Sequence, residues 1–185
     1  VIKIDNEGNL DKTFAKQGKL IQNILKNNGD IGRSIYISKN DNIYLIGSTL
    51  NGYNFDTYVI KMNNKGEIDN NFGENGKAII DNPGKINDPY IDDFGNCIYV
   101  DRKEKIYISG ETGKNNNYDI YIIRLNRKGK VDTSFGNQGK VIIKDVGNKN
   151  GDDRCESMTV NNNSIFLLGN NFNITNYDTF LIKIK

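Results

Sequence analysis

The stretch VDTSFGNQGKV at residues 131–141 decides the fold, because two related copies of it occur earlier in the chain. Residues 68–78 read IDNNFGENGKA, and residues 10–20 read LDKTFAKQGKL. The phenylalanines of the three copies lie 58 and 63 residues apart, and the glycines of their Gly-Lys pairs keep the same steps. A sequence that repeats with a constant period builds one structural unit per copy. The chain therefore contains a repeat of about sixty residues.

Two further blocks recur in constant order between the copies of this motif. An apolar run that ends in glycine occupies residues 43–47, 106–110 and 165–169, and an aspartate followed by an apolar run begins at residues 56, 119 and 178. We treat residues 1–185 as one repeat domain with units at 9–67, 68–130 and 131–185. Residues 1–8 resemble the end of a preceding unit, because Val1-Ile2-Lys3-Ile4 parallels Val59-Ile60-Lys61-Met62.

Each unit is predicted to form four short β-strands. In the first unit these are Lys19–Leu25, Arg33–Ser38, Asn42–Thr49 and Thr57–Met62, all rich in Ile, Tyr, Val and Leu. The segments between them contain the Asn, Asp and Gly residues that favour tight turns. No long window shows the spacing of an amphipathic helix. The chain is therefore predicted to be all-β.

The motif at residues 131–141 resembles the signature of the delta-60 repeat, a bacterial repeat family assigned to the β-propeller group. Residues 151–153, Gly169 and residues 177–180 fall where later blocks of that family would fall. The first copy departs from the motif, since Ala15 stands in place of a glycine. The resemblance implies one propeller blade per repeat and an exported or cell-surface bacterial protein. It implies no reaction, because it brings no catalytic residues with it.

The expected fold is a β-propeller-like array of about three four-stranded antiparallel blades plus one extra N-terminal strand. Propellers usually close a ring with four to eight blades, so three blades should not close one alone. Repeat arrays with uncapped ends expose apolar faces, which drives association. We expect a longer chain or a homodimer to complete the ring, and an open arc capped by another component is the remaining alternative.

The composition excludes several classes of function. The chain has no histidine, which rules out a Ser-His-Asp triad and every imidazole metal site. Its formal net charge of +2 is too small to predict a nucleic-acid partner. No stretch approaches the roughly 18 apolar residues of a transmembrane helix, so membrane insertion is not expected.

The aspartates of the repeated motif, Asp11, Asp69 and Asp132, have two interpretations. Carboxylates can take part in acid–base chemistry or bind Ca²⁺, and they can also cap turns by accepting main-chain N–H bonds. Because one such aspartate occurs in every unit, we favour the structural role. The same reasoning applies to the aspartates that precede a strand in each unit, at residues 56, 119 and 178.

Acidic residues that break the repeat are the better candidates for binding. Asp92 and Asp93 follow Tyr90 in one loop, and Asp152 and Asp153 are expected in the matching loop of the third unit. These five residues form the predicted ligand-binding set. Oxygen-rich loops also suit Ca²⁺, although the spacing matches no EF-hand, and ordinary solvated loop charge is the alternative. No catalytic residue and no other cofactor is predicted.

Two further groups of residues have more than one interpretation. Cys97 and Cys155 lie 58 residues apart, close to one period, and could be a disulfide between blades or two free buried thiols, of which we favour the second. Exposed tyrosines with neighbouring asparagines could form a rim for sugars or peptides, or simply fill loops. The tyrosines in question are Tyr53, Tyr90, Tyr118 and Tyr177.

The sequence favours a non-catalytic interaction module of an exported or surface bacterial protein, which binds a protein or glycan partner. The first alternative is a carboxylate-dependent glycan hydrolase or lyase that uses loop aspartates such as Asp92 and Asp153. The second is a structural surface protein that assembles through open-ended contacts between blades. An enzyme needs carboxylates that converge in one pocket, whereas a scaffold shows dispersed acidic loops.

Overall fold

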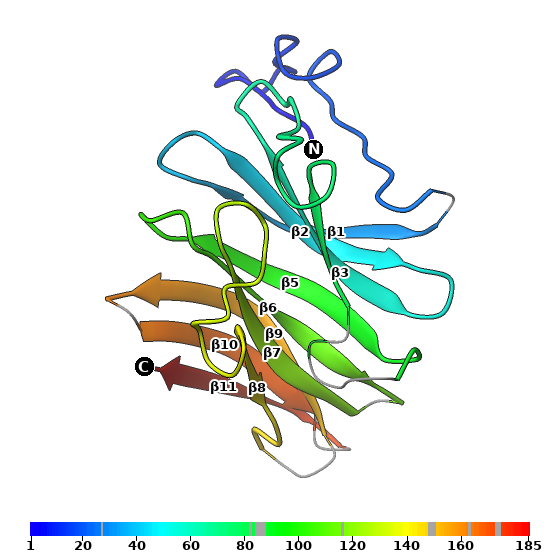
Figure 1. The fold of residues 1–185 in the computed structure, drawn as a ribbon, viewed down its shortest axis with the longest axis vertical. Coiled ribbons are helices and arrows are strands. Elements are labelled where there is room, and N and C mark those ends of the chain that lie inside the picture. The colour runs from blue at the N-terminus through cyan, green and yellow to red at the C-terminus, as the bar shows by residue number, and fades with distance from the viewer. Residues whose placement is uncertain are drawn as a thin grey trace.

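The computed structural model describes residues 1–26, 28–81, 83, 88–115, 117–147, 151–162, 164–172 and 175–185. All regular elements in these residues are β-strands, and they form three antiparallel sheets that follow one another in chain order (Figure 1). Sheet 1 contains β1 (Asp30–Ile37), β2 (Ile43–Leu50), β3 (Phe55–Met62) and β4 (Lys77–Ile80). Sheet 2 contains β5 (Asp92–Val100), β6 (Ile106–Lys114), β7 (Asn117–Leu125) and β8 (Lys140–Ile143). Sheet 3 contains β9 (Asp152–Asn161), β10 (Ser164–Phe172) and β11 (Tyr177–Ile184).

The predicted all-β array of antiparallel sheets is confirmed, with two corrections. Sheet 3 has three strands in the described residues instead of four, and among them no strand pairs with the free edge of β11. The predicted strand Lys19–Leu25 does not form, and Ile2 and Ile4 make isolated bridges instead of the extra N-terminal strand. A strand needs a continuous partner, and Lys19 meets the N-terminal segment only at Ile2.

The three sheets stack face to face, and each junction is a hydrophobic core. Between sheets 1 and 2 the core contains Tyr44, Ile46 and Val59 from one side and Ile108 and Tyr121 from the other. A second core between sheets 2 and 3 includes Ile122 and Leu167. A third core covers the outer face of sheet 1, where residues of the N-terminal segment contact it. Strands such as β2 and β6 are buried on both faces, which explains their nearly continuous apolar sequence.

A glycine in the second strand of each sheet is required by close packing of backbones. The first strands contain a β-bulge near the point where they pair with this glycine. A Cβ atom on Gly110 would lie 1.7 Å from the carbonyl oxygen of Phe94, and the corresponding distances are 1.9 Å at Gly47 and 2.0 Å at Gly169. The glycine that ends each repeated apolar run is therefore a packing requirement of the sheet.

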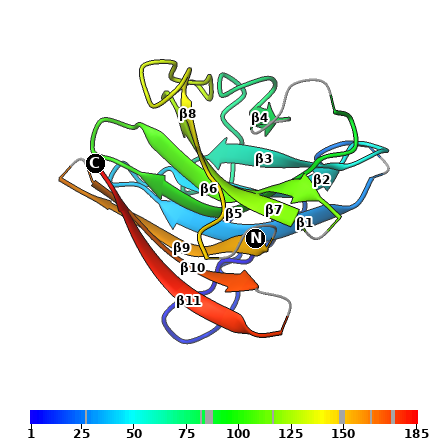
Figure 2. The same ribbon diagram turned by 90° about the horizontal axis from the view of Figure 1, so that it is seen from below.

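The sheets and the sequence units are offset in phase. β4 follows the second copy of the repeated motif, yet it pairs with β3 of sheet 1, and β8 follows the third copy and pairs with β7 of sheet 2. In Figure 2 these two strands lie on the same side of the molecule. The second and third copies of the motif thus each lead into the last strand of the sheet that precedes them.

Candidate functional site

The aspartates of the repeated motif serve the turn in which they lie. Asp11, Asp69 and Asp132 each accept the main-chain N–H of the residue two positions later, at 3.0, 3.1 and 3.3 Å. Each also pairs with a cation of the preceding strand or segment. The pairs are Lys3–Asp11 at 2.8 Å, Lys61–Asp69 at 2.9 Å and Arg124–Asp132 at 2.9 Å. Asp132 also pairs with Lys105, at 2.5 Å, and this contact is the main cause of its lowered pKa. The cation and N–H contacts likewise lower the pKa of Asp69, and that of Asp11 to about 2. The capping role expected for these residues is confirmed.

The opposite end of every sheet carries a row of three polar residues on neighbouring strands. The first and third residues of the row are aspartates, and the middle one is a threonine or an asparagine. The rows are Asp30–Thr49–Asp56 in sheet 1, Asp93–Thr112–Asp119 in sheet 2 and Asp153–Asn171–Asp178 in sheet 3. Directly opposed residues on neighbouring strands share one face of a sheet. Pairing of the strands therefore brings together acidic residues that lie more than twenty positions apart in the sequence.

Asp92 and Asp93 begin strand β5 and do not lie in the solvated loop that the sequence suggests. Asp92 accepts the main-chain N–H of Phe55 at 3.0 Å and the Tyr118 hydroxyl at 3.2 Å. Burial of the Tyr118 hydroxyl, and to a smaller extent the charge of Asp92, raises the pKa of Tyr118 to about 12. Asp93 is fully buried, and its main-chain carbonyl accepts the Thr57 hydroxyl at 3.0 Å. This pair therefore joins sheet 2 to sheet 1.

Asp152 and Asp153 are likewise the first residues of a strand, β9, and both are buried. Asp153 accepts the main-chain N–H of Val146 at 3.0 Å and the amide of Asn171 at 2.6 Å, and burial raises its pKa. Asp152 lies 3.8 Å from the guanidinium of Arg154. The expected loop position is wrong for both pairs, because pairing with β6 and β10 continues up to these aspartates.

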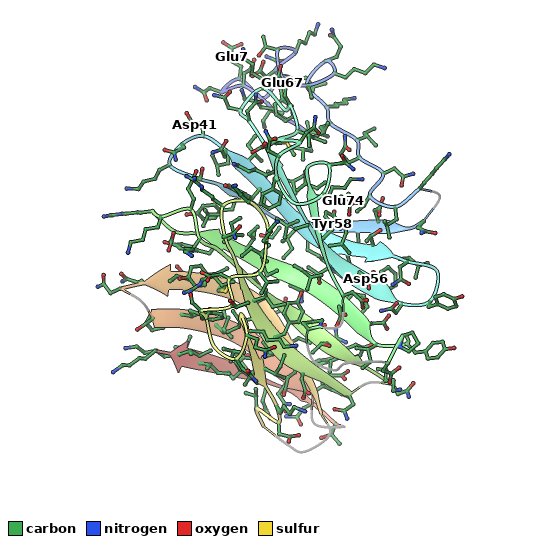
Figure 3. The ribbon with its side chains drawn as sticks, in the orientation of Figure 1. Glu7, Asp41, Asp56, Tyr58, Glu67 and Glu74 are labelled. Atoms are coloured by element: carbon green, nitrogen blue, oxygen red, sulfur yellow. The ribbon has the colours of Figure 1, made fainter. Side chains whose placement is uncertain are left out.

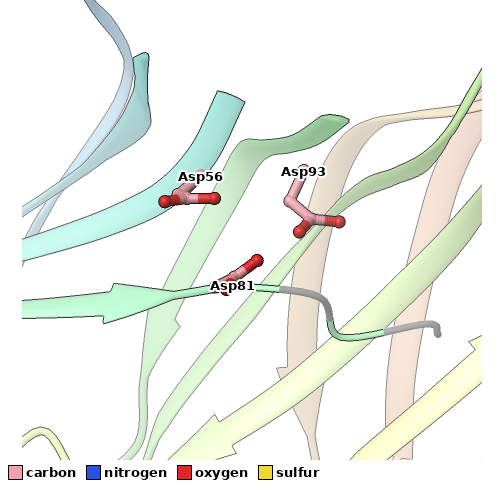
Figure 4. Close-up of side chains that lie close together, drawn as sticks. All are labelled: Asp56, Asp81 and Asp93. Atoms are coloured by element: carbon pink, nitrogen blue, oxygen red, sulfur yellow. The ribbon is translucent and has the colours of Figure 1, made fainter. Parts of the chain in front are cut away.

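Three carboxylates converge between sheets 1 and 2. Asp56 from β3, Asp81 directly after β4 and Asp93 from β5 place one oxygen each within 4.8 Å of the others (Figure 4). Asp56 also accepts the amides of Asn51 at 2.8 Å and Asn54 at 3.3 Å. Burial, together with the charge of Asp81, raises the pKa of Asp56 to about 6. Figure 3 shows Asp56 near the end of sheet 1 at which β3 begins.

The sequence pattern does not predict this cluster as a unit. It singles out Asp56 and Asp93 separately and passes over Asp81, because the third unit has Lys144 at the position after β8. Only the pairing of β3 with β4 and the packing of β5 on sheet 1 bring the three together. Chemically, the cluster offers three carboxylate oxygens, whereas Ca²⁺ takes six to eight. It also holds one carboxyl group that changes its protonation near pH 6.

Aromatic side chains line the same end of the sheets. We call Tyr53, Phe55, Tyr90, Phe94, Tyr118, Phe172 and Tyr177 the aromatic rim, whose rings are in contact in three separate groups: Tyr53 with Tyr90, Phe94 with both Phe55 and Tyr118, and Phe172 with Tyr177. Tyr53 and Tyr90 are 76% and 63% exposed, and their ring centres lie 6.4 Å apart in an edge-to-face arrangement. Tyr53 belongs to the β2–β3 turn, and the ends at which β2, β6 and β10 finish lie along one edge of the molecule (Figure 1). The rim thus crosses all three sheets.

Four surface hollows in the described part of the chain lie away from the predicted residues. The largest of these four measures about 580 Å³ and lies over the outer face of sheet 1, where Leu20, Ile35 and Leu45 contribute to its wall. None of the four is lined by the five residues predicted to bind a ligand. The predicted residues are therefore not gathered in one of these hollows.

The comparisons with known proteins agree with the observed sheets. A family model described as "Domain of unknown function (DUF5122) beta-propeller" matches residues 105–135, which include β6, β7 and the first part of the third motif. No curated protein matches the chain. The match supports a β-propeller-like repeat. In the described residues no helix is long and apolar enough to span a membrane.

Proposed function

We propose that the chain is an array of three delta-60-type repeats that binds a protein or glycan partner without catalysing a reaction. The aromatic rim supports this proposal, because its exposed pair Tyr53 and Tyr90 joins loops that flank neighbouring sheets. Tyrosine faces stack on the apolar faces of sugars, and tyrosine is enriched among the residues that dominate protein interfaces. Loops carried on a rigid β-scaffold are the usual place for such contacts.

Two of the carboxylates predicted for binding are held by donors within the chain. Asp92 has donors from Phe55 and Tyr118, and Asp153 has donors from Val146 and Asn171. A glycosidase needs one carboxyl group that protonates the leaving oxygen and a second that acts as nucleophile or base. Two carboxylates that are held by protein donors on different sheets fit that chemistry poorly.

The alternative, a carboxylate-dependent glycan hydrolase or lyase, has one observation in its favour. Asp56 lies with Asp81 and Asp93, and its pKa of about 6 is in the range of a general acid. Under this alternative, Asp56→Asn would abolish turnover of a bound glycan. Under the binding proposal, no glycan is turned over and the same variant still binds.

An exported or cell-surface location and a ring completed by a second copy or by a longer chain belong to the same proposal. Support for ring completion comes from the two ends of the stack. Sheet 3 exposes Leu168 and Leu181, and sheet 1 exposes Ile35 and Ile37 at the other end. Exposed apolar faces of this kind also support the alternative of a self-assembling surface protein.

The experiment is a binding screen of the purified chain against bacterial surface oligosaccharides and peptides, followed by titration of each hit. We expect the double variant Tyr53→Ala, Tyr90→Ala to weaken binding at least tenfold, and Leu10→Ala in a distant turn to leave it unchanged. Incubation of each bound glycan with the chain should release no product. Release of product that Asp56→Asn abolishes would overturn the non-catalytic proposal in favour of the enzyme.

A further inference from the structure

The two cysteines meet where sheet 3 packs on sheet 2. Cys97 lies in β5 and Cys155 in β9, the first strands of their sheets, and their sulfur atoms are 3.5 Å apart. Both residues are buried, and both thiols are free in the structure, as the sequence favoured. The distance corresponds to direct contact of two sulfur atoms without a bond.

The contact is specific to this junction and is not part of the repeat. The register of the three β-bulges makes Cys155 equivalent to Gly32 and Gly95, and makes Cys97 equivalent to Ser34 and Ser157. A Cβ atom on Gly95 would lie 2.5 Å from the Thr57 side chain and 2.9 Å from the carbonyl oxygen of Gly47. The junction of sheets 1 and 2 therefore excludes a side chain at the place where the junction of sheets 2 and 3 has a thiol. Departures from a repeat are where a special role is expected.

We propose that Cys97 and Cys155 are a peroxide-sensitive thiol pair that closes into a disulfide bond between β5 and β9. The pair is prepared for this by its own contact, because the two sulfurs lie 3.5 Å apart and either thiol can donate a hydrogen bond to the other. The same contact lowers the pKa of Cys155 and raises that of Cys97, because a hydrogen bond from the Cys97 thiol stabilises the Cys155 thiolate. The thiolate is the nucleophilic form, so Cys155 is the residue that reacts first.

Hydrogen peroxide is the oxidant in this scheme, and it is small enough to approach a buried sulfur. The Cys155 thiolate attacks one peroxide oxygen and the O–O bond breaks, which gives the sulfenic acid. The departing hydroxide takes up the proton that Cys155 released on forming the thiolate and becomes one water. The Cys97 sulfur then attacks the Cys155 sulfur, the S–O bond breaks, and the departing hydroxide combines with the Cys97 proton. In total, two thiols lose two hydrogen atoms and one peroxide becomes two water molecules.

The bond would join β5 to β9 across the core that Ile120 and Leu167 share with both cysteines. The residues between Cys97 and Cys155 include β6, β7 and β8, so the closed loop would contain most of sheet 2. A disulfide stabilises mainly by restricting the unfolded chain, and more so for long loops. We expect the oxidised protein to melt roughly 5–15 °C above the reduced one.

The test is treatment of the reduced, folded chain with stoichiometric hydrogen peroxide, followed by intact mass and peptide mapping without reductant. We expect a loss of about 2 Da, one linked peptide that joins the β5 and β9 sequences, and reversal by a thiol reductant. Cys97→Ser introduces the residue present at the equivalent positions of the other sheets and should fold normally. It should leave Cys155 as a sulfenic acid that reacts with dimedone.

Three outcomes would overturn the proposal. The first is that both cysteines of the wild-type chain remain available to alkylation in denaturant after peroxide treatment. The second is oxidation of one cysteine to sulfinic acid without a linked peptide. The third is a linked peptide found only in a covalent dimer on a non-reducing gel. The wild-type measurements decide these outcomes even if Cys97→Ser does not fold. This inference is independent of the proposed binding function.

Discussion

Aspartate has two opposite roles in this chain, and the local surroundings decide between them. At the motif turns, N–H groups and a nearby cation favour the charged form, so the pKa of Asp132 falls below its ordinary value. At the other end of the sheets, burial favours the neutral form, so the pKa of Asp56 rises to about 6. The first kind of aspartate stabilises the fold at neutral pH, and the second kind costs stability there.

Asp132→Asn should destabilise the chain by about 1–2 kcal/mol at pH 7, because it removes a charge that Lys105, Arg124 and Ser134 contact. The folded pKa of Asp132 is lower than the unfolded one, so its contribution is present above about pH 4 and is lost as the pH falls below that value. Urea unfolding of wild type and variant between pH 2 and pH 7 measures the difference. Glu7→Gln in an exposed turn is the matched control and should change little. A variant that is as stable as wild type at pH 7 would refute the capping role.

Asp56→Asn should have the opposite pH dependence. The folded pKa of Asp56 is about 6 and the unfolded one is about 4, so the folded state holds a proton that the unfolded state has lost between these values. The stability of the wild type therefore falls as the pH rises from about 4 to about 6, and the variant lacks this part of the decrease. We expect the variant to gain about 1–2 kcal/mol relative to wild type between pH 4 and pH 7.5, as measured by urea unfolding across that range. A difference that does not change with pH would show that folding does not raise the pKa of Asp56.

At the scale of the strand, the glycines show how tightly neighbouring backbones approach. Gly110 is opposite the bulge of β5, where even a methyl group would collide with the carbonyl oxygen of Phe94. Both strands are fixed by sheets packed on either face, so neither can move away. The bulge in the first strand and the glycine in the second therefore occur together, as one structural feature, in all three sheets.

Gly110→Ala should destabilise the chain by about 2–4 kcal/mol, because the added methyl group must displace a main-chain carbonyl in the core. Gly29→Ala is the matched control, since a Cβ atom there meets nothing within 4 Å and the residue does not need a positive φ. Chemical denaturation of both variants measures the effect. Equal stabilities of the two variants would mean that the strands separate easily at the bulge.

The elements were predictable where their pattern is local, and unpredictable where it depends on pairing. Apolar runs such as Ile43–Ile46 indicated strands, and the recurrence of the motif indicated three similar sheets. The segment Lys19–Leu25 contains four apolar residues but meets no continuous partner strand, so it stays irregular. The cluster of Asp56, Asp81 and Asp93 could not be predicted, because its members come from three strand positions that only sheet packing brings together.

At the scale of the whole molecule, the stack has two different ends. Sheet 3 presents Leu168 and Leu181 to solvent, and the outer face of sheet 1 presents Ile35 and the hollow beside it. Inside the stack, faces of these two kinds pack against each other at both junctions. A second copy could therefore dock head to tail by repeating a contact that the chain already makes with itself.

Leu181→Asp and Ile35→Asp should each reduce self-association of the chain, which sedimentation equilibrium at micromolar concentration measures. Each variant alters one end of the stack and leaves the other intact, because the two residues lie on opposite terminal sheets. A mixture of the two variants should therefore form a dimer through the two intact faces, and each variant alone should not. Val131→Lys, at an exposed turn position, is the control for added surface charge. A wild-type mass of one chain at every concentration would exclude head-to-tail association.

The offset between sequence unit and sheet has a consequence for how such a gene can grow. The second and third motifs lead into β4 and β8, the last strands of the sheets before them, so consecutive sequence units share a sheet. Duplication of one sequence unit would add one complete unit. The inserted motif would supply the last strand of the sheet before it, and the next motif would complete the new sheet. After loss of one unit by recombination, the next motif would likewise supply the last strand of the sheet before it. The number of units can thus differ between related genes while every sheet that is followed by a motif keeps its last strand.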